Sequence, residues 1–195
     1  MQSVFGRNRR VGGLGYAWPR MAAAPESRTG VRVVVDGTGG ATITTGLPIL
    51  DHLLGLLARY AGFDLTLEVA PGSPDDEVAA AGSSLGAALG GALRADGVRG
   101  IGSAVVPADE ALAHVAVEAS GRPLLVSNVD LSAARVGGLD TDVVARFLRE
   151  LAEGAGLTMH VRLLNGNDTS HVLEAIFKAL GVALAQSCRK RRREE

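Results

Sequence analysis

The strongest constraint on the fold of this 195-residue chain is an internal repeat. Residues 47–70 carry apolar side chains at helical spacing, then an Ala-Gly pair, then an alternating strand pattern, and residues 139–164 follow the same plan. The Ala-Gly pairs lie 94 positions apart, and two later Leu-Gly segments, at 85–89 and 180–184, lie 95 positions apart. A loop insertion accounts for the one-residue difference, so we interpret the chain as a duplication.

Strand patterns precede each repeated helix. Residues 31–37 and 41–46 are β-branched runs joined by an Asp-Gly-Thr-Gly turn, which is typical of a β-hairpin. Residues 104–121 and 122–130 give further alternating runs in the second half. The order of strands, helix, strand and helix, twice over, predicts an α+β fold of two duplicated halves, each with helices on one face of a small sheet.

Four segments are expected from these patterns and from the composition of the termini. They are a flexible N-terminal arm (1–22), a first α+β half (23–103), a second α+β half (104–187) and a charged C-terminal tail (188–195). The first 20 residues lack the continuous apolar region of a secretory signal, although an acid-poor, Arg-containing leader also fits a transit peptide. The tail, from Arg189 onward, can bind polyanions or be a solvated, frayed terminus.

Composition and charge narrow the classes of function. A hydrophobic content of 47% and a formal net charge of −1 are ordinary for a globular protein and point to neither a nucleic-acid nor a membrane partner. No apolar run reaches the length of a membrane span. The single cysteine, Cys188, excludes an internal disulfide framework and favours a reducing, cytoplasmic location.

Candidate metal ligands gather late in the sequence. His160 lies on a short apolar strand pattern, a polar Asn-Gly-Asn-Asp turn follows, and His171 and Glu174 then lie three positions apart where a helix begins. Because positions three apart share a helix face, this imidazole and carboxylate can address one Zn²⁺, Mn²⁺ or Fe²⁺ ion. The alternative is a solvated first turn in which the helix dipole favours the glutamate.

Three segments resemble signature segments of a known enzyme family. They read DGTGGATITTGLPILDHLL (36–54), VPADEALAHVAVEASGRPLLV (106–126) and NDTSHVLEAIFKAL (167–180). The family is imidazoleglycerol-phosphate dehydratase of histidine biosynthesis, and the likeness covers roughly residues 26–186. It implies duplicated units of four strands and two helices, of the ribosomal protein S5 domain 2-like kind, in a large symmetric homo-oligomer. It also implies a hydro-lyase that uses two Mn²⁺ ions at subunit interfaces to remove water from imidazoleglycerol phosphate, a small phosphate ester.

The resemblance also assigns metal ligands, and several are substituted in this chain. The family's two His-His-x-x-Glu motifs fall here on Asp75, Asp76 and Ala79, and on Ser170, His171 and Glu174. The family's isolated histidines are matched by His52 and His160. One implied ligand set is His52, Asp76, His171 and Glu174, in which aspartate is a competent oxygen ligand for Mn²⁺. The other set keeps only His160, so we expect one Mn²⁺ site and an empty second one.

The remaining functional positions follow from the same resemblance. Glu26 takes the place of the family's N-terminal glutamate, as a catalytic acid or base. Arg122 and Lys178 match phosphate-binding positions, while a third family arginine falls on Gly100, beside Arg99. Cationic donors are what a phosphate ester requires. The alternative for Glu26 is an exposed loop carboxylate without a catalytic role. The alternative for Arg122 and Lys178 is that they are ordinary surface cations. Two functions therefore stay open: a dehydratase, or a catalytically silent homologue that acts as an oligomeric scaffold or binds a phosphorylated ligand.

Overall fold

The computed structural model describes residues 29–129, 135–136 and 139–191. The expected arm (1–22) and the last residues of the charged tail lie outside this part. The elements, in chain order, are β1 (Gly30–Val34), β2 (Ala41–Thr44), α1 (Pro48–Ala61), β3 (Asp64–Glu68), α2 (Pro74–Leu93), β4 (Ile101–Ala108), β5 (Ala111–Glu118), β6 (Leu124–Ser127), β7 (Arg135–Val136), β8 (Leu139–Asp140), α3 (Thr141–Ala155), β9 (Thr158–Asn165) and α4 (Thr169–Cys188).

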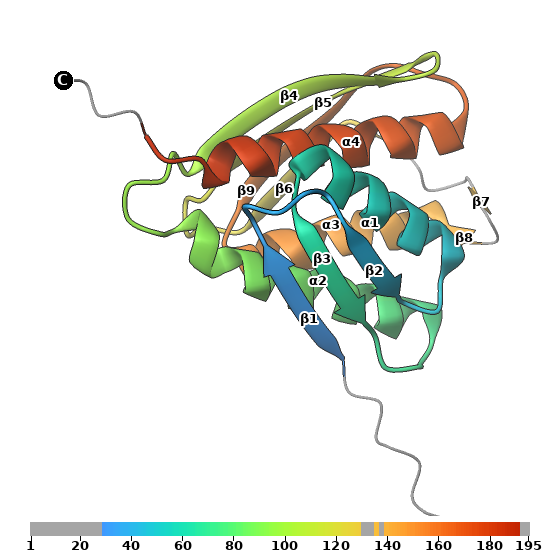
Figure 1. Cartoon of the computed structure of the whole chain (residues 1–195). Coiled ribbons are helices and arrows are strands. Elements are labelled where there is room, and N and C mark those ends of the chain that lie inside the picture. The colour runs from blue at the N-terminus through green and yellow to red at the C-terminus, as the bar shows by residue number, and fades with distance from the viewer. Residues whose placement is uncertain (1–28, 130–134, 137–138, 192–195) are drawn as a thin grey trace, which may run out of the picture.

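The four helices lie between two sheets (Figure 1). The first sheet has the order β1-β3-β2, and the second has the order β4-β5-β9-β6. Helices α1 and α2 contact β2 and β1 of the first sheet, while α4 and α3 contact the second sheet. The helices also pair across the two halves, α1 with α4 and α2 with α3. One hydrophobic core therefore joins both halves.

The sheets confirm the predicted duplication. In the first sheet β3 pairs antiparallel with β1 and parallel with β2, and in the second sheet β9 pairs antiparallel with β5 and parallel with β6. The second sheet therefore repeats the three-strand pattern and adds β4 at its edge, which completes the expected four strands. Among the described residues, the first sheet has no counterpart of β4.

The predicted hairpin between residues 31–37 and 41–46 is wrong. β1 and β2 do not pair with each other, because β3 returns after α1 and lies between them. Asp64, the first residue of β3, holds the connecting loop by accepting hydrogen bonds from the backbone N–H groups of Thr38 (2.8 Å) and Gly40 (3.0 Å). These bonds lower the pKa of the Asp64 carboxyl. The Asp-Gly-Thr-Gly segment thus wraps around a neighbouring strand end.

Helix α1 shows why the periodic segments fold as expected. Its buried leucines, Leu50, Leu53, Leu54 and Leu57, recur at intervals of three and four and form one apolar stripe. Pro48 begins the helix, and Gly62 ends it with a left-handed φ of 70°, so the Ala-Gly pair of the repeat is a helix stop. Within the described ranges, none of the helices is both long and apolar enough to span a membrane.

The repeated Leu-Gly segments mark where helices of different halves touch. A Cβ on Gly86 of α2 would lie 2.6 Å from the backbone oxygen of Leu151 in α3. A Cβ on the equivalent Gly181 of α4 would lie 2.5 Å from the backbone oxygen of Leu57 in α1. Both glycines therefore permit a close helix approach that a larger residue prevents. The repeat preserves a contact between the halves.

Candidate functional site

Two segments far apart in the sequence bring a histidine, a glutamate and a lysine together. His52 lies on α1, and Glu174 and Lys178 lie one turn apart on α4, which packs against α1. His52 Nε2 is 3.2 Å from Glu174 Oε1, and Lys178 Nζ donates to Glu174 Oε2 at 3.0 Å. We call these three residues the α1–α4 cluster.

The electrostatics of the α1–α4 cluster keep its carboxylate charged. Lys178, whose side chain is only 14% exposed, is the main cause of a lowered Glu174 pKa, and His52 adds to it. The ammonium also lies 5.9 Å from the ring centroid of Tyr60, within reach of a cation–π attraction. An ionised Glu174 accepts hydrogen bonds only, so it suits a cation or a polar N–H of a ligand.

His171 has a different set of partners. Its Nδ1 lies 2.5 Å from Glu110 Oε2, and its Nε2 lies 3.5 Å from Asp109 Oδ2. Glu110 also accepts from the backbone N–H of Asp168, which is the N-cap of α4. That backbone bond and His171 lower the pKa of Glu110 to about 2, while Glu110 raises the pKa of His171. We call Asp109, Glu110 and His171 the turn cluster.

Sequence reasoning missed the two carboxylates of the turn cluster. They form the two-residue turn between β4 and β5, and Asp109 adopts a positive φ of 47° there. The signal was present, because Pro-Ala-Asp-Glu interrupts the alternation of residues 104–121 with adjacent polar residues. The turn lies against the start of α4 because β5 pairs with β9, which leads into that helix.

The expected convergence of His171 and Glu174 on one point is not found within a single chain. Each side chain engages its own cluster, although the two residues are three positions apart on α4. Among the described residues, no group of three or more histidine, cysteine, aspartate or glutamate side chains is placed to hold a metal ion. The α1–α4 cluster supplies only two potential ligands, one imidazole and one carboxylate.

The other predicted metal ligands lie elsewhere in the chain. Asp76 accepts a hydrogen bond from Ser73 Oγ (2.7 Å) at the start of α2, where Ser73 is the N-cap. Asp75 lies 3.7 Å from Arg146 of α3. His160 is exposed on β9, facing outward between Ala116 of β5 and Val126 of β6. These residues have no shared point of contact in one chain.

The predicted phosphate-binding cations are also dispersed. Lys178 belongs to the α1–α4 cluster, Arg99 lies in the loop between α2 and β4, and Arg122 lies in the turn between β5 and β6. Both arginines are exposed. Glu26, the predicted catalytic acid or base, lies outside the described residues.

A model of a known protein family matches most of this chain. The family model "Imidazoleglycerol-phosphate dehydratase" matches residues 45–184, which include all members of both clusters. The chain belongs to the imidazoleglycerol-phosphate dehydratase family. The predicted resemblance is thereby confirmed, and the match covers α1, α2, α3, the second sheet, β3 and all but the last residues of α4.

Individual members of the imidazoleglycerol-phosphate dehydratase family are similar over most of the chain. The enzyme of that name from Syntrophobacter fumaroxidans is 44% identical over 169 residues, covering 84% of this chain and 85% of the relative. The one from Desulforudis audaxviator is 44% identical over 168 residues, covering 84% and 86%. A crystal structure from Staphylococcus aureus superposes with a TM-score of 0.73 at 35% identity, covering 80% of this chain and 92% of that one. A second, from Pyrococcus furiosus in complex with (S)-C348, gives a TM-score of 0.72 at 30% identity, covering 85% and 92%.

Proposed function

We propose that this protein is a hydro-lyase that removes water from imidazoleglycerol phosphate in histidine biosynthesis. The observation that carries the proposal is the α1–α4 cluster. It joins His52 of one family-like segment to Glu174 and Lys178 of another, 122 positions away. It combines a carboxylate and an imidazole with a partly buried cation, which suits a substrate that bears an imidazole at one end and a phosphate at the other.

We include a metal ion in the proposed site only with ligands from two copies of the chain. A protein site for Mn²⁺ needs more than the two ligands that the α1–α4 cluster supplies. In the part of the chain that the structure describes, the donors of one copy therefore do not fit the ion by themselves, and we propose that a second copy contributes the rest. When bound, Mn²⁺ would supply positive charge close to the substrate imidazole.

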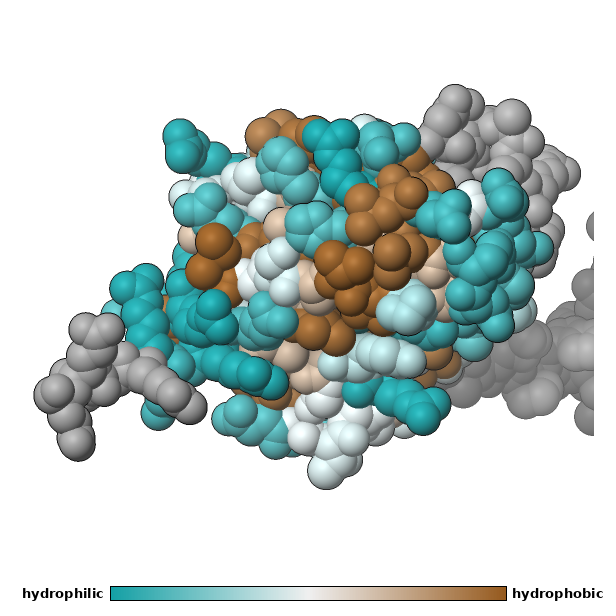
Figure 2. Space-filling model, turned by 90° about the horizontal axis from the view of Figure 1, so that it is seen from above, coloured by the Kyte–Doolittle hydropathy of each residue, from teal (hydrophilic) through white to brown (hydrophobic). Residues whose placement is uncertain are grey.

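Assembly as a symmetric homo-oligomer is supported by the outer face of the second sheet. Figure 2 looks down on this face, where hydrophobic side chains form patches among hydrophilic ones. Ile101, Val105, Leu124 and Leu164 are each more than half exposed on the strands of this sheet. His160 lies on the same sheet and is exposed. Apolar patches of this kind are typical of protein interfaces. A copy seated here would bring ligands to an otherwise isolated imidazole, and we propose that this assembly works in the cytoplasm.

We propose that the predicted cations Lys178, Arg122 and Arg99 bind the phosphate group of the substrate. Lys178 has three N–H donors, of which Glu174 takes one, so the ammonium retains donors for a phosphate oxygen. Arg122 and Arg99 are exposed, and both lie in loops and not on α4, which carries Lys178. We propose that they meet a substrate phosphate across a subunit boundary, as the metal ligands do.

A catalytically silent homologue is the second candidate, and the start of α2 favours it. The positions of the family's first histidine pair hold Asp75 and Asp76, which are engaged with Arg146 and with the helix cap. Ala79 takes the place of a glutamate and offers no ligand. A chain that keeps the fold and the α1–α4 cluster could in this way bind a phosphorylated ligand without turning it over.

Turnover decides between the two candidates. Purified protein is incubated with imidazoleglycerol phosphate, with and without Mn²⁺, and the formation of imidazoleacetol phosphate is followed. We expect Mn²⁺-dependent turnover that Glu174→Gln reduces by about 100-fold or more, as loss of a charged group at a reacting centre does. Glu68→Gln, at the exposed last residue of β3, is the control and should retain activity. Substrate binding without turnover would favour the silent homologue.

A further inference from the structure

The turn that carries Arg122 is held in place by the connection between α3 and β9. The backbone N–H of Gly121 donates to the oxygen of Gly156 (3.0 Å), and Thr158 Oγ1 donates to the oxygen of Arg122 (3.1 Å). Ser120 Oγ stabilises the turn from within, because it accepts from the backbone N–H of Arg122 (3.1 Å). The position of Arg122 therefore depends on the residues that directly follow α3.

An arginine from the first half of the chain contacts the end of α3. Arg94, the C-cap of α2, donates from Nη1 to the backbone oxygen of Ala155 (2.6 Å), the last residue of α3. The hydrogen bond is partly buried and joins residues 61 positions apart. The last backbone oxygens of a helix carry partial negative charge, which a guanidinium stabilises. Arg94 thus fixes the end of the helix that precedes Gly156 and Thr158.

Two glycines leave room for the guanidinium of Arg94 at this place. A Cβ on Gly90 of α2 would lie 2.7 Å from Arg94 Nη2, and a Cβ on Gly156 would lie 3.0 Å from Arg94 Nη1. Gly156 also has a left-handed φ of 69°, a conformation that favours glycine. The guanidinium therefore lies between α2 and the residue whose backbone oxygen binds Gly121.

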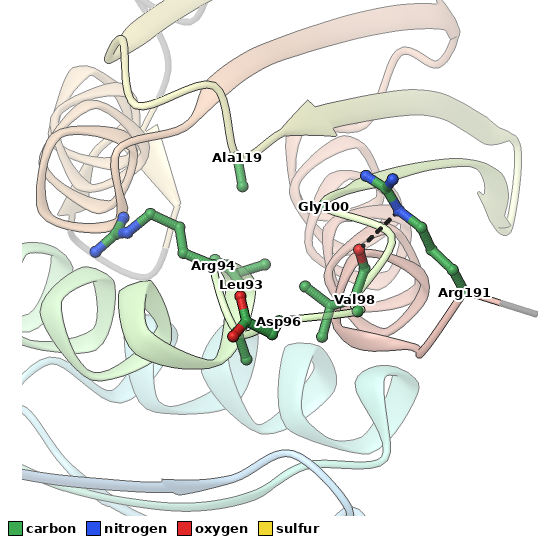
Figure 3. Close-up of a pocket in the computed structure, with 9 residues that line it drawn as sticks. Leu93, Arg94, Asp96, Val98, Gly100, Ala119 and Arg191 are labelled. Atoms are coloured by element: carbon green, nitrogen blue, oxygen red, sulfur yellow. Dashed lines mark hydrogen bonds between the residues drawn. The ribbon is translucent and has the colours of Figure 1, made fainter.

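The side chain of Arg94 is directed at α3 and not at the cations that follow α4. Figure 3 shows Arg94 and Arg191 on opposite sides of the pocket beside the loop after α2, with the Arg94 side chain extending away from Arg191. Arg191 Nε donates instead to the backbone oxygen of Val98 (3.0 Å). The contact with α3 gives Arg94 a role separate from that of the residues after α4.

We propose that Arg94 is a positioning residue for Arg122. The proposal rests on the function proposed above, in which Arg122 binds the phosphate group of the substrate. Arg94 binds the last residue of α3, and the residue after it binds Gly121, which directly precedes Arg122. Hydrogen bonds from charged donors are among the stronger ones in proteins, so their loss is felt by the neighbouring backbone. Without the guanidinium of Arg94, the turn of Arg122 becomes more mobile and Arg122 binds the phosphate group less well.

Hydrogen–deuterium exchange of the full chain tests the structural step without any substrate. In Arg94→Gln we expect the backbone amides of segment 119–124 to exchange at least about tenfold faster than in wild type, equivalent to about 1.4 kcal/mol of local protection. The amides of β5 and β9 should keep their rates. Arg32→Gln removes an exposed arginine from β1 and is the matched control, which should leave exchange of the turn unchanged. Unchanged exchange of the turn in Arg94→Gln would overturn the proposal, and so would an equal rise throughout the second sheet.

A double-mutant cycle tests whether Arg94 acts through Arg122. With imidazoleglycerol phosphate as substrate, Arg94→Gln should raise KM about tenfold and leave kcat nearly unchanged. In an Arg122→Gln background the same substitution should have no further effect, because the two residues then act as one unit. Arg94→Lys keeps a charged donor and should recover most of the wild-type KM. Additive effects of the two glutamine substitutions, or a lowered kcat with an unchanged KM, would contradict the proposal.

The two experiments separate this proposal from the function on which it rests. If the chain binds imidazoleglycerol phosphate without turnover, the dissociation constant replaces KM in the same cycle. If the chain does not bind that substrate, the proposed function fails, whereas the exchange rates of segment 119–124 still decide whether Arg94 fixes the turn of Arg122.

Discussion

Replacing Gly86 with alanine should destabilise the protein, although alanine is the better helix former. Gly86 lies within α2, where alanine is worth about 1 kcal/mol more than glycine in a free helix. In this fold, however, the added Cβ would lie 2.6 Å from the oxygen of Leu151 and 2.9 Å from the nitrogen of Ala155. Both are backbone atoms of α3, so no side-chain rotation can relieve the contact.

The magnitude follows from how far the helices must separate. An ordinary Cβ contact begins near 3.4 Å, so α2 and α3 would have to move apart by about 0.8 Å. Overpacking of this kind costs about 1–3 kcal/mol, and a contact between two backbones belongs at or beyond the upper end. After the gain in helix propensity is subtracted, we expect a loss of about 2 kcal/mol in the free energy of unfolding.

Two glycines provide matched controls for this substitution. Gly91 on the same helix and Gly55 on α1 have no atom within 4 Å of an added Cβ. Their alanine variants should be unchanged or more stable by up to about 1 kcal/mol. Urea unfolding followed by far-UV circular dichroism, at one fixed protein concentration, measures all three. If Gly86→Ala were as stable as Gly91→Ala, the close contact between the duplicated halves would be refuted.

Two further predictions concern local polar contacts. Because hydrogen bonds from the loop lower the pKa of Asp64, its contribution to stability is present above its ordinary value and is lost as pH falls through the lowered one. Acid unfolding of Asp64→Asn should accordingly show a weaker pH dependence below pH 4 than that of wild type, and an unchanged dependence would contradict the assignment. Asp168 accepts from the backbone N–H groups of Ser170 (2.8 Å) and His171 (3.2 Å) as the N-cap of α4. Its replacement by alanine should cost about 1 kcal/mol in urea unfolding, while Asp168→Asn should retain most of the stability.

The fold followed from the sequence wherever periodicity and stop signals agreed. The leucine stripe of α1 and the Ala-Gly pair at 61–62 define a helix and its end from local information alone. Strand order is not local. The Asp-Gly-Thr-Gly segment has hairpin chemistry, but Asp64, more than 20 residues later, attracts its N–H groups and brings β3 between the two strands. Competition from a distant strand overrode the turn preference.

The site was less predictable than the fold. Spacing along a helix shows which face a side chain occupies, but it does not show which residue from another segment that side chain contacts. His171 and Glu174 share a stretch of α4, yet Glu110 captures one and His52 with Lys178 captures the other. Glu110 and His52 come from segments about 60 and 120 positions away, which only the folded chain brings close. Family resemblance identified His52 and Lys178 as functional positions. Lys178 lies four positions after Glu174 on α4, whereas nothing in the spacing alone linked His52 to Glu174.

Turnover by mixed oligomers tests most directly whether two copies complete one dehydratase site. His52→Ala and His171→Ala subunits are prepared separately, co-expressed, and assayed with imidazoleglycerol phosphate and Mn²⁺ beside the wild-type protein. We predict that each variant alone is inactive. The mixture should recover about one quarter of wild-type activity, because that fraction of randomly paired sites receives an intact His52 from one copy and an intact His171 from the other. Mixed oligomers that form but stay as inactive as the single variants would contradict the account.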